Sequence, residues 1–329
     1  MALSQDIDLG AEPGAHGWFG FDDTAIMHLC PHARCRLAAV HADQFPVDAD
    51  LVGRLLRRQL PAYAQLPMRR VASGGTVNAV FRLGRDLSVR LPLTADGVGS
   101  VLLESRWLPR LAPLLPVAVP GVVFTGEPSD GFPFPWAVHR WLDGRPLVEG
   151  RAPDAVVRAV ARFVDTFRSI DLPDAPPAHR STPLAAVDAE ARAAFESLRS
   201  FDEEIDVDAV VSTWARVTAV PYDEAQRRWI HSDLMPSNLL AANGRLGAVL
   251  DFGTVGIGDP AVDLIPAWNL CTPRSREIFR NHVDSDDLTW ERGRGWAMSM
   301  AAVQLPYYRD TNPIISANAR WVLRQVLTD

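Results

Sequence analysis

Residues Trp229 to Leu264 read WIHSDLMPSNLLAANGRLGAVLDFGTVGIGDPAVDL, and this stretch is the most informative part of the chain. It holds the pattern His-x-Asp-x4-Asn, which places Asp233 five residues before Asn238, and an Asp-Phe-Gly triplet that starts at Asp251. Phosphoryl transfer needs a carboxylate facing the acceptor hydroxyl, with hard oxygen ligands for a divalent cation close beside it. The spacing therefore predicts that Asp233 orients a substrate hydroxyl and accepts its proton, while Asn238 and Asp251 bind Mg²⁺ on the phosphates of ATP.

The neighbouring residues predict short strands that present these side chains. Residues 227–230 enter the His-Ser-Asp turn, residues 238–241 leave it, and the apolar run 246–250 delivers Asp251 at its end. Ligand-binding residues are commonly presented at strand ends. The Gly-Asp-Pro that follows predicts the start of a helix, with Asp259 as its N-cap.

Together, His-x-Asp-x4-Asn, Asp-Phe-Gly and Gly-Asp-Pro-x2-Asp-Leu resemble the motifs of the aminoglycoside phosphotransferase family, whose members phosphorylate small molecules and include macrolide and choline kinases. The family typically has glycine where this chain has Ser232, a small residue that fits unless the turn requires a positive φ. The resemblance implies an α+β, protein-kinase-like fold of two lobes, a small β-rich N-lobe and a larger, mostly helical C-lobe. It also implies ATP and Mg²⁺ as cofactors, and Asp259 and Asp263 as residues that brace the catalytic loop.

A kinase-like site also needs a cation on the nucleotide phosphates and a carboxylate that holds this cation in place. The chain contains no lysine. Arg90 is the candidate, because Leu87, Val89 and Leu91 alternate on one face of a strand and leave Arg90 on the other. Arginine binds phosphate bidentately, and it also occurs at this position among family relatives similar to the macrolide kinases. Glu104 is its expected partner, since it lies on an apolar helical stripe where a carboxylate needs a counter-ion. The alternative is an ordinary surface arginine and a Glu104 that reaches solvent.

Two further segments are expected at the nucleotide. Ser73, Gly74, Gly75 and Thr76 form a turn between two strand-like runs, where backbone amides would lie over the phosphates; a plain hairpin loop is the alternative. Residues 136–144 predict a strand that joins the two lobes, with the adenine hinge near residues 139–142 and with His139 and Trp141 at the nucleotide. Trp136 and Trp141 would otherwise be packing residues, which is the more common role of aromatic side chains.

The hydrophobic pattern divides the chain into an N-lobe over residues 41–141 and a C-lobe over residues 142–329, with residues 1–40 as an N-terminal extension outside the resemblance. In the N-lobe it predicts a helix near 48–60, three strands within 68–91, the helix of Glu104, a strand near 119–125 and the hinge strand. In the C-lobe it predicts helices near residues 152–170, 183–200, 208–220, 261–270, 274–282, 288–305 and 314–327.

Composition narrows the class of protein. With 329 residues, 47% of them hydrophobic, and a net charge of −7, the chain is typical of a soluble globular protein, and its acidic balance disfavours nucleic-acid binding. No apolar run approaches eighteen residues, and the N-terminus does not resemble a signal peptide, so we expect no membrane span and a cytoplasmic location. The three cysteines are too few for a disulfide framework. His28, Cys30, His32 and Cys35 match no standard zinc spacing.

The acceptor is predicted to be a small molecule with a hydroxyl group, and two features favour different ones. Eight acidic residues between positions 188 and 208, against two arginines, favour a cationic acceptor such as an aminoglycoside, another antibiotic or a choline-like amino alcohol, unless they form a solvated helix face. Aromatic residues near the C-terminus would instead suit a large apolar acceptor such as a macrolide. These are Trp268, Trp290, Trp296, Tyr307, Tyr308 and Trp321.

Two other functions fit the sequence less well. A protein kinase is disfavoured because no Ala-Pro-Glu element follows Asp251 at the expected place. A catalytically silent relative, which binds nucleotide without transferring phosphate, would account for the absent lysine and for Ser232. Every other residue of the phosphoryl-transfer template is present, however. The sequence leaves the oligomeric state open.

Overall fold

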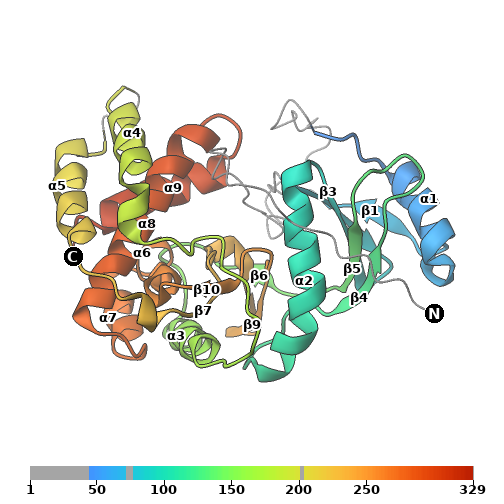
Figure 1. The fold of residues 1–329 in the computed structure, drawn as a ribbon, viewed down its shortest axis with the longest axis horizontal. Helices are drawn as coiled ribbons and strands as arrows, with labels where there is room; N and C mark the ends of the chain where they lie inside the picture. Colours follow the sequence, from blue (N-terminus) through green and yellow to red (C-terminus); the bar gives the residue numbers. More distant parts are fainter. Residues whose placement is uncertain (1–43, 72–76, 201–203, 329) are drawn as a thin grey trace.

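The computed structural model describes residues 44–71, 77–200 and 204–328, and it has two lobes (Figure 1). The first is built on a five-stranded antiparallel sheet, and the second is mostly helical. This confirms the predicted α+β, kinase-like architecture. The boundary between residues 141 and 142 stays a prediction, as does the extension at residues 1–40, which lies outside the described residues together with the histidines and cysteines considered above for zinc.

The N-lobe sheet has the strand order β1-β2-β3-β5-β4. Its strands are β1 (Met68–Arg70), β2 (Asn78–Leu83), β3 (Leu87–Pro92), β4 (Val122–Gly126) and β5 (Trp136–Arg140). Leu87, Val89 and Leu91 of β3 are buried in the core of the N-lobe, as their alternation in the sequence predicts. Helix α1 (Ala49–Gln59) contributes Leu55 and Leu56 to that same core.

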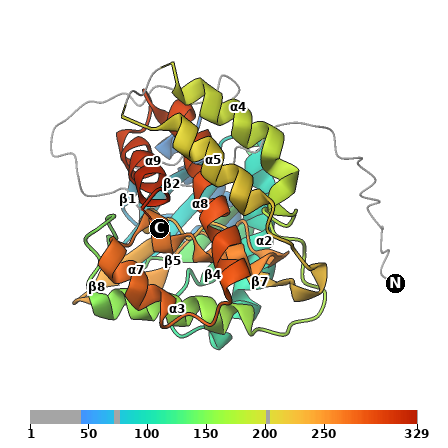
Figure 2. The ribbon, with the colours of Figure 1, turned by 90° about the vertical axis from the view of Figure 1, so that its left-hand side faces the viewer.

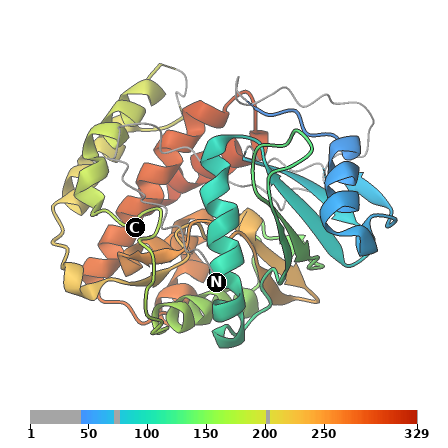
Figure 3. The same ribbon diagram turned by 45° about the vertical axis from the view of Figure 1, so that its right-hand side comes forward.

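Helix α2 (Val98–Leu111) runs between the sheet and the helical lobe, as Figure 3 shows. Its buried residues include Val101, Glu104, Leu108 and Leu111, the stripe that the three- and four-residue spacing predicts, and also Trp107. Glu104 is the one charged member of this stripe, and it is fully buried. The helix therefore carries a carboxylate to the junction of the two lobes.

The C-lobe contains most of the helices, which Figure 2 shows from the side of that lobe. They are α3 (Asp154–Arg168), α4 (Asp188–Leu198), α5 (Val207–Thr218), α6 (Pro266–Asn269), α7 (Pro273–Arg280), α8 (Asp287–Tyr308) and α9 (Pro313–Gln325). Its short strands are β6 (Arg145–Pro146), β7 (Arg228–Ile230), β8 (Leu239–Ala242), β9 (Arg245–Val249) and β10 (Gly256–Gly258). Strand β7 pairs with β10, and β8 lies between β6 and β9.

The structure corrects three predicted elements. Residues 261–270 form a 3₁₀ turn, Pro260–Leu264, and the separate short α6, because Pro266 has no amide hydrogen to continue one helix. Residues 183–200 begin with a 3₁₀ turn, Leu184–Val187, before α4. The strand predicted near 119–125 begins at Val122 instead.

Candidate active site

The turn after β7 carries the residues of the His-x-Asp motif, and Asp263 holds it in place. The backbone amides of His231 and Ser232 donate to the two carboxylate oxygens of Asp263, at 2.7 and 2.9 Å. All three residues are buried. The sequence predicted that Asp263 braces the catalytic loop, and these two hydrogen bonds show how it does so.

Ser232 adopts a positive φ of 73° at the centre of this turn. This is the left-handed region, which explains why glycine is typical here and why serine is strained. The hydroxyl of Ser232 accepts a hydrogen bond of 3.1 Å from the backbone amide of Arg180. The guanidinium of Arg180 also donates to the carbonyl of Ser232. Serine therefore makes a contact that glycine cannot make.

Asp233 is oriented by two neighbours and keeps one oxygen available. Asn238 donates through Nδ2 to Oδ2 and to the carbonyl of Asp233, both at 3.0 Å. The other oxygen, Oδ1, is buried without a hydrogen-bond partner among the described residues, and Arg180 lies 3.8 Å from it. Burial raises the pKa of Asp233 to about 6, while Arg180 and Asn238 oppose that rise. A carboxylate with one free oxygen suits a general base that receives a hydroxyl hydrogen.

Asn238 and Asp251 are the residues that the sequence predicts as magnesium ligands. Oδ1 of Asn238 is buried and has no hydrogen-bond partner among the described residues. Burial raises the pKa of Asp251, and the nearby carboxylates of Glu104 and Asp233 raise it further, against the effect of Arg90. A divalent cation beside Asp251 would stabilise the ionised form of its side chain. Magnesium typically binds one or two protein oxygens together with nucleotide phosphates and water, so these two residues fit it.

Arg90 connects the two lobes electrostatically. It donates through Nη1 to Glu104 at 2.8 Å and through Nη2 to Asp251 at 3.3 Å, and all three side chains are buried. Glu104 also accepts from the backbone amide of Phe252 at 2.9 Å. The predicted pairing of Arg90 with Glu104 is confirmed, and the surface alternative is wrong. The contact with Asp251 joins Arg90, the predicted phosphate-binding cation, to the Asp-Phe-Gly segment.

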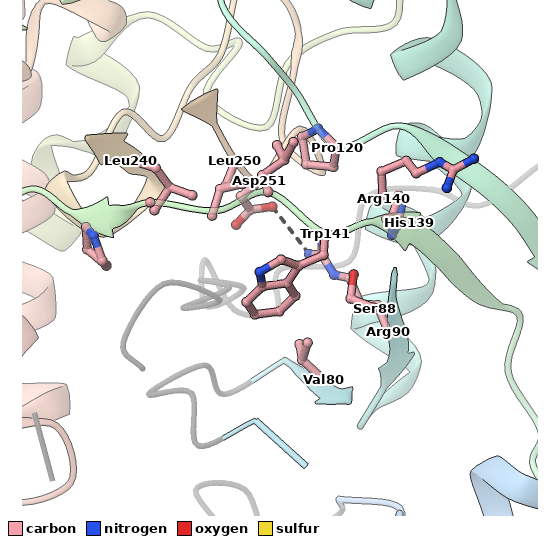
Figure 4. A pocket seen from close by; sticks show the side chains of 13 residues that line it. Val80, Ser88, Arg90, Pro120, His139, Arg140, Trp141, Leu240, Leu250 and Asp251 are labelled. Carbon is pink, nitrogen blue, oxygen red and sulfur yellow. Dashed lines mark hydrogen bonds and ion pairs between the residues drawn. The ribbon is translucent and has the colours of Figure 1, made fainter. Parts of the chain in front are cut away.

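The cleft beside Arg90 is lined by both lobes, as Figure 4 shows. Its empty volume, the open mouth included, is about 730 Å³, within the range of ligand sites. Val80 lines it from the sheet lobe, and Leu240 and Leu250 line it from the helical lobe. An apolar slot next to a buried arginine suits a nucleotide, with the base between aliphatic side chains and the phosphates near Arg90.

His139 and Trp141 both line this cleft. The ring of His139 is buried, with Nε2 3.6 Å from Oε2 of Glu104, and burial lowers its pKa. The indole of Trp141 lies against the guanidinium of Arg82 and donates to Asp143 at 3.0 Å. Trp136 is fully buried in the N-lobe core, as the packing alternative predicts. The predicted turn of Ser73, Gly74, Gly75 and Thr76 lies outside the described residues, which resume at Val77.

Sequence reasoning missed several residues of the site. Arg180 comes from the proline-containing connector before α4, which carries no motif, and only folding brings it to the catalytic turn. Leu240 and Leu250 lie on or next to strands that were predicted, but aliphatic residues there do not distinguish a cleft wall from core. Asp259 caps the Pro260–Leu264 turn as predicted, and it also forms a buried ion pair of 2.8 Å with Arg292 on α8.

The fold and the site define a class of protein: a kinase-like phosphotransferase with a nucleotide cleft between two lobes. Comparison with known families agrees, because the sequence profile of the phosphotransferase enzyme family matches residues 68–296. The chain belongs to this family, and it is an ATP-dependent phosphotransferase that acts on small molecules. Comparison with curated proteins gives no match. In the described residues, no helix is both long and apolar enough to cross a membrane.

Solved structures with a similar fold include aminoglycoside and macrolide phosphotransferases. Wild-type aminoglycoside 2'-phosphotransferase-IIIa, solved with GDP, has a TM-score of 0.63 and 18% identity, over 84% of this chain and 97% of that one. Macrolide 2'-phosphotransferase MphH from Brachybacterium faecium, an apoenzyme, has a TM-score of 0.55 and 21% identity, over 85% and 98%. Macrolide 2'-phosphotransferase type I has a TM-score of 0.58 and 15% identity, over 84% and 96%. At these identities the likeness concerns the fold.

Proposed function

We propose that this protein transfers the γ-phosphate of ATP to a hydroxyl group of an antibiotic or a related amine-containing small molecule. The observation that carries the proposal is the buried Oδ1 of Asp233, which has no hydrogen-bond partner among the described residues although Asn238 fixes the other oxygen. In this geometry Asp233 receives the hydroxyl hydrogen of the acceptor and directs its oxygen towards the phosphate.

The remaining roles follow from the contacts of each side chain. Asn238 and Asp251 would hold Mg²⁺, which, when bound, neutralises the charge on the nucleotide phosphates. Arg90, kept in place by Glu104, would contact those phosphates from the N-lobe. Arg180, 3.8 Å from Asp233, opposes the rise in its pKa and so favours the ionised form that acts as a base.

The protein would work in the cytoplasm, where ATP is supplied and thiols stay reduced. Cys271 is a buried free thiol, which agrees with that location. Its partner is the small-molecule hydroxyl acceptor, and nothing in the site calls for nucleic acid.

The test is ADP release from Mg-ATP by the purified protein over a panel of aminoglycosides, macrolides and choline-like amino alcohols. Asp233→Asn is the matched blank, because asparagine keeps the shape of the side chain and its contact with Asn238 but cannot accept a proton. We expect acceptor-dependent ADP release that falls by about 100-fold or more in the variant, while nucleotide binding is retained. Equal turnover by Asp233→Asn would refute the assignment of the base.

A further inference from the structure

Two small cavities lie beside the catalytic turn, along one face of α8. The first has an empty volume of about 370 Å³, its open mouth included, and is lined by Arg180, Glu190, Trp296 and Met300, among others. The second, of about 190 Å³, shares Met300 and is lined also by Met235, two residues after Asp233. Because Arg180 and Met235 both border the catalytic turn, an acceptor in these cavities would have a hydroxyl within reach of Asp233.

The lining of these cavities is mostly apolar. Among the described residues that line them, Glu190 is the only carboxylate and Arg180 the only cation. Trp296 and Met300 on α8 supply large apolar surfaces. A site that binds a molecule with several ammonium groups needs several carboxylates, since each buried charge requires a partner. This lining does not provide them.

Glu190 differs from its acidic neighbours in the segment 188–208. Glu196 and Asp208 pair with Arg199, and Glu204 pairs with Arg324. These three side chains are 62%, 84% and 77% exposed, so they form a solvated face. Glu190 has no ion pair or hydrogen bond among the described residues, and partial burial raises its pKa. A carboxylate in this position is available to a cation from outside the chain.

Two of the residues that line the cavities each carry a buried polar atom without a hydrogen-bond partner. Nε1 of Trp296 and Oδ1 of Asn269 are buried without a hydrogen-bond partner among the described residues, and both side chains are at least 98% buried. Buried donors and acceptors are normally paired, and unpaired ones near a cavity indicate a ligand or water. One donor and one acceptor can each be satisfied by a hydroxyl group of a ligand.

We infer that the acceptor is a mostly apolar, hydroxylated molecule with a single basic amine, and that Glu190 binds this amine. The inference rests on the proposed function and narrows its substrate class. It disfavours aminoglycosides with several amines, although the acidic segment of the sequence suggested them, because Glu196, Glu204 and Asp208 of that segment lie on solvent-facing surfaces and pair with arginines.

The test is calorimetric titration of the Asp233→Asn protein loaded with Mg-ADP, so that binding is measured without turnover. The probes are erythromycin, which has one basic amine, its N-oxide, in which that amine is no longer basic, and kanamycin, which has several amines. We expect erythromycin to bind, and to bind about 10-fold or more tightly than either other probe, as expected for one charge-assisted contact.

Glu190→Gln, made in the same protein, is the matched change, and Glu196→Gln on the exposed side of α4 is its control. Glu190→Gln should weaken erythromycin binding about 10-fold and leave N-oxide binding unchanged, whereas Glu196→Gln should change neither. Trp296→Phe keeps an aromatic ring and removes the N–H donor. It should weaken the binding of erythromycin and of its N-oxide equally, by a smaller factor than the 10-fold expected for Glu190→Gln.

Three results would overturn the inference: kanamycin binding as tightly as erythromycin, Glu190→Gln behaving like its control, or no binding of erythromycin at all. The function of the site is judged separately by ADP release from the wild-type protein over the wider panel. Turnover of a polycationic acceptor alone would leave the kinase function intact and reject only the substrate class.

Discussion

Ser232 allows a quantitative test, because one residue combines backbone strain with a specific hydrogen bond. Two substitutions separate these effects. Ser232→Ala removes the hydroxyl and keeps a Cβ at φ 73°, whereas Ser232→Gly removes the hydroxyl and relieves the strain. In both variants the backbone amide of Arg180, which is buried, loses the 3.1 Å contact with the hydroxyl.

The expected magnitudes follow from these losses. An unsatisfied buried amide costs about 1–3 kcal/mol, so both variants should be less stable than the wild type. An L-residue in the left-handed region costs about 1–2 kcal/mol, and glycine avoids this cost. Part of that gain is lost, because glycine has greater conformational freedom in the unfolded chain. We therefore expect Ser232→Ala to lower the free energy of unfolding by about 2 kcal/mol. The loss in Ser232→Gly should be smaller by about 1 kcal/mol.

The assay is urea unfolding of the nucleotide-free protein, followed by tryptophan fluorescence, with all three proteins at one concentration. Comparison of the two variants isolates the strain, since each lacks the hydroxyl. If alanine proves as stable as glycine at this position, the positive φ carries no strain. If both match the wild type, the hydrogen bond from Arg180 contributes nothing.

Three other substitutions test the ion pairs of the site. Arg90→Lys keeps the charge but cannot contact Glu104 and Asp251 with one planar fork, so the KM for ATP should rise about 10-fold; an unchanged KM would show that any cation suffices. Asp251→Asn removes the charged metal ligand and should make Mg²⁺-dependent binding of ATP too weak to detect by calorimetry; retained Mg²⁺ dependence would contradict that role. Arg292→Met leaves the buried carboxylate of Asp259 unpaired and should cost about 3–5 kcal/mol of unfolding free energy, whereas a change below 1 kcal/mol would mean that this pair does not stabilise the C-lobe.

Most of the fold follows from local patterns that the sequence displays. The alternation of Leu87, Val89 and Leu91 predicts β3, and the spacing of Val101, Glu104 and Leu108 predicts the buried face of α2. These predictions hold because one face of each element packs against a core, so the spacing of apolar residues along the sequence matches the buried face of the element. The prediction over residues 261–270 was wrong because it gave too little weight to Pro266, which interrupts the backbone hydrogen bonding.

The candidate site divides in a similar way. The contacts of Asp233 with Asn238, and of the Pro260–Leu264 turn with Asp259, lie within a few residues of chain, so spacing alone indicates them. The pairing of Arg90 with Glu104 was predicted from the rule that a buried charge needs a partner. The roles of His139 and Trp141, and of the turn at Ser73 to Thr76, stay predictions.

By itself, the sequence determined the reaction type, because phosphoryl transfer requires a carboxylate, a carboxamide and a second carboxylate at short, fixed separations that a continuous stretch of chain can encode. The tertiary structure alone decided what surrounds that chemistry. Arg180 reaches the catalytic turn from a connector 52 residues away, and Arg90 reaches Asp251 across 161 residues. Glu190 lines a cavity, whereas Glu196, Glu204 and Asp208 face solvent. Composition counts charges, but packing determines which of them are solvated, which are paired, and which remain available to a ligand.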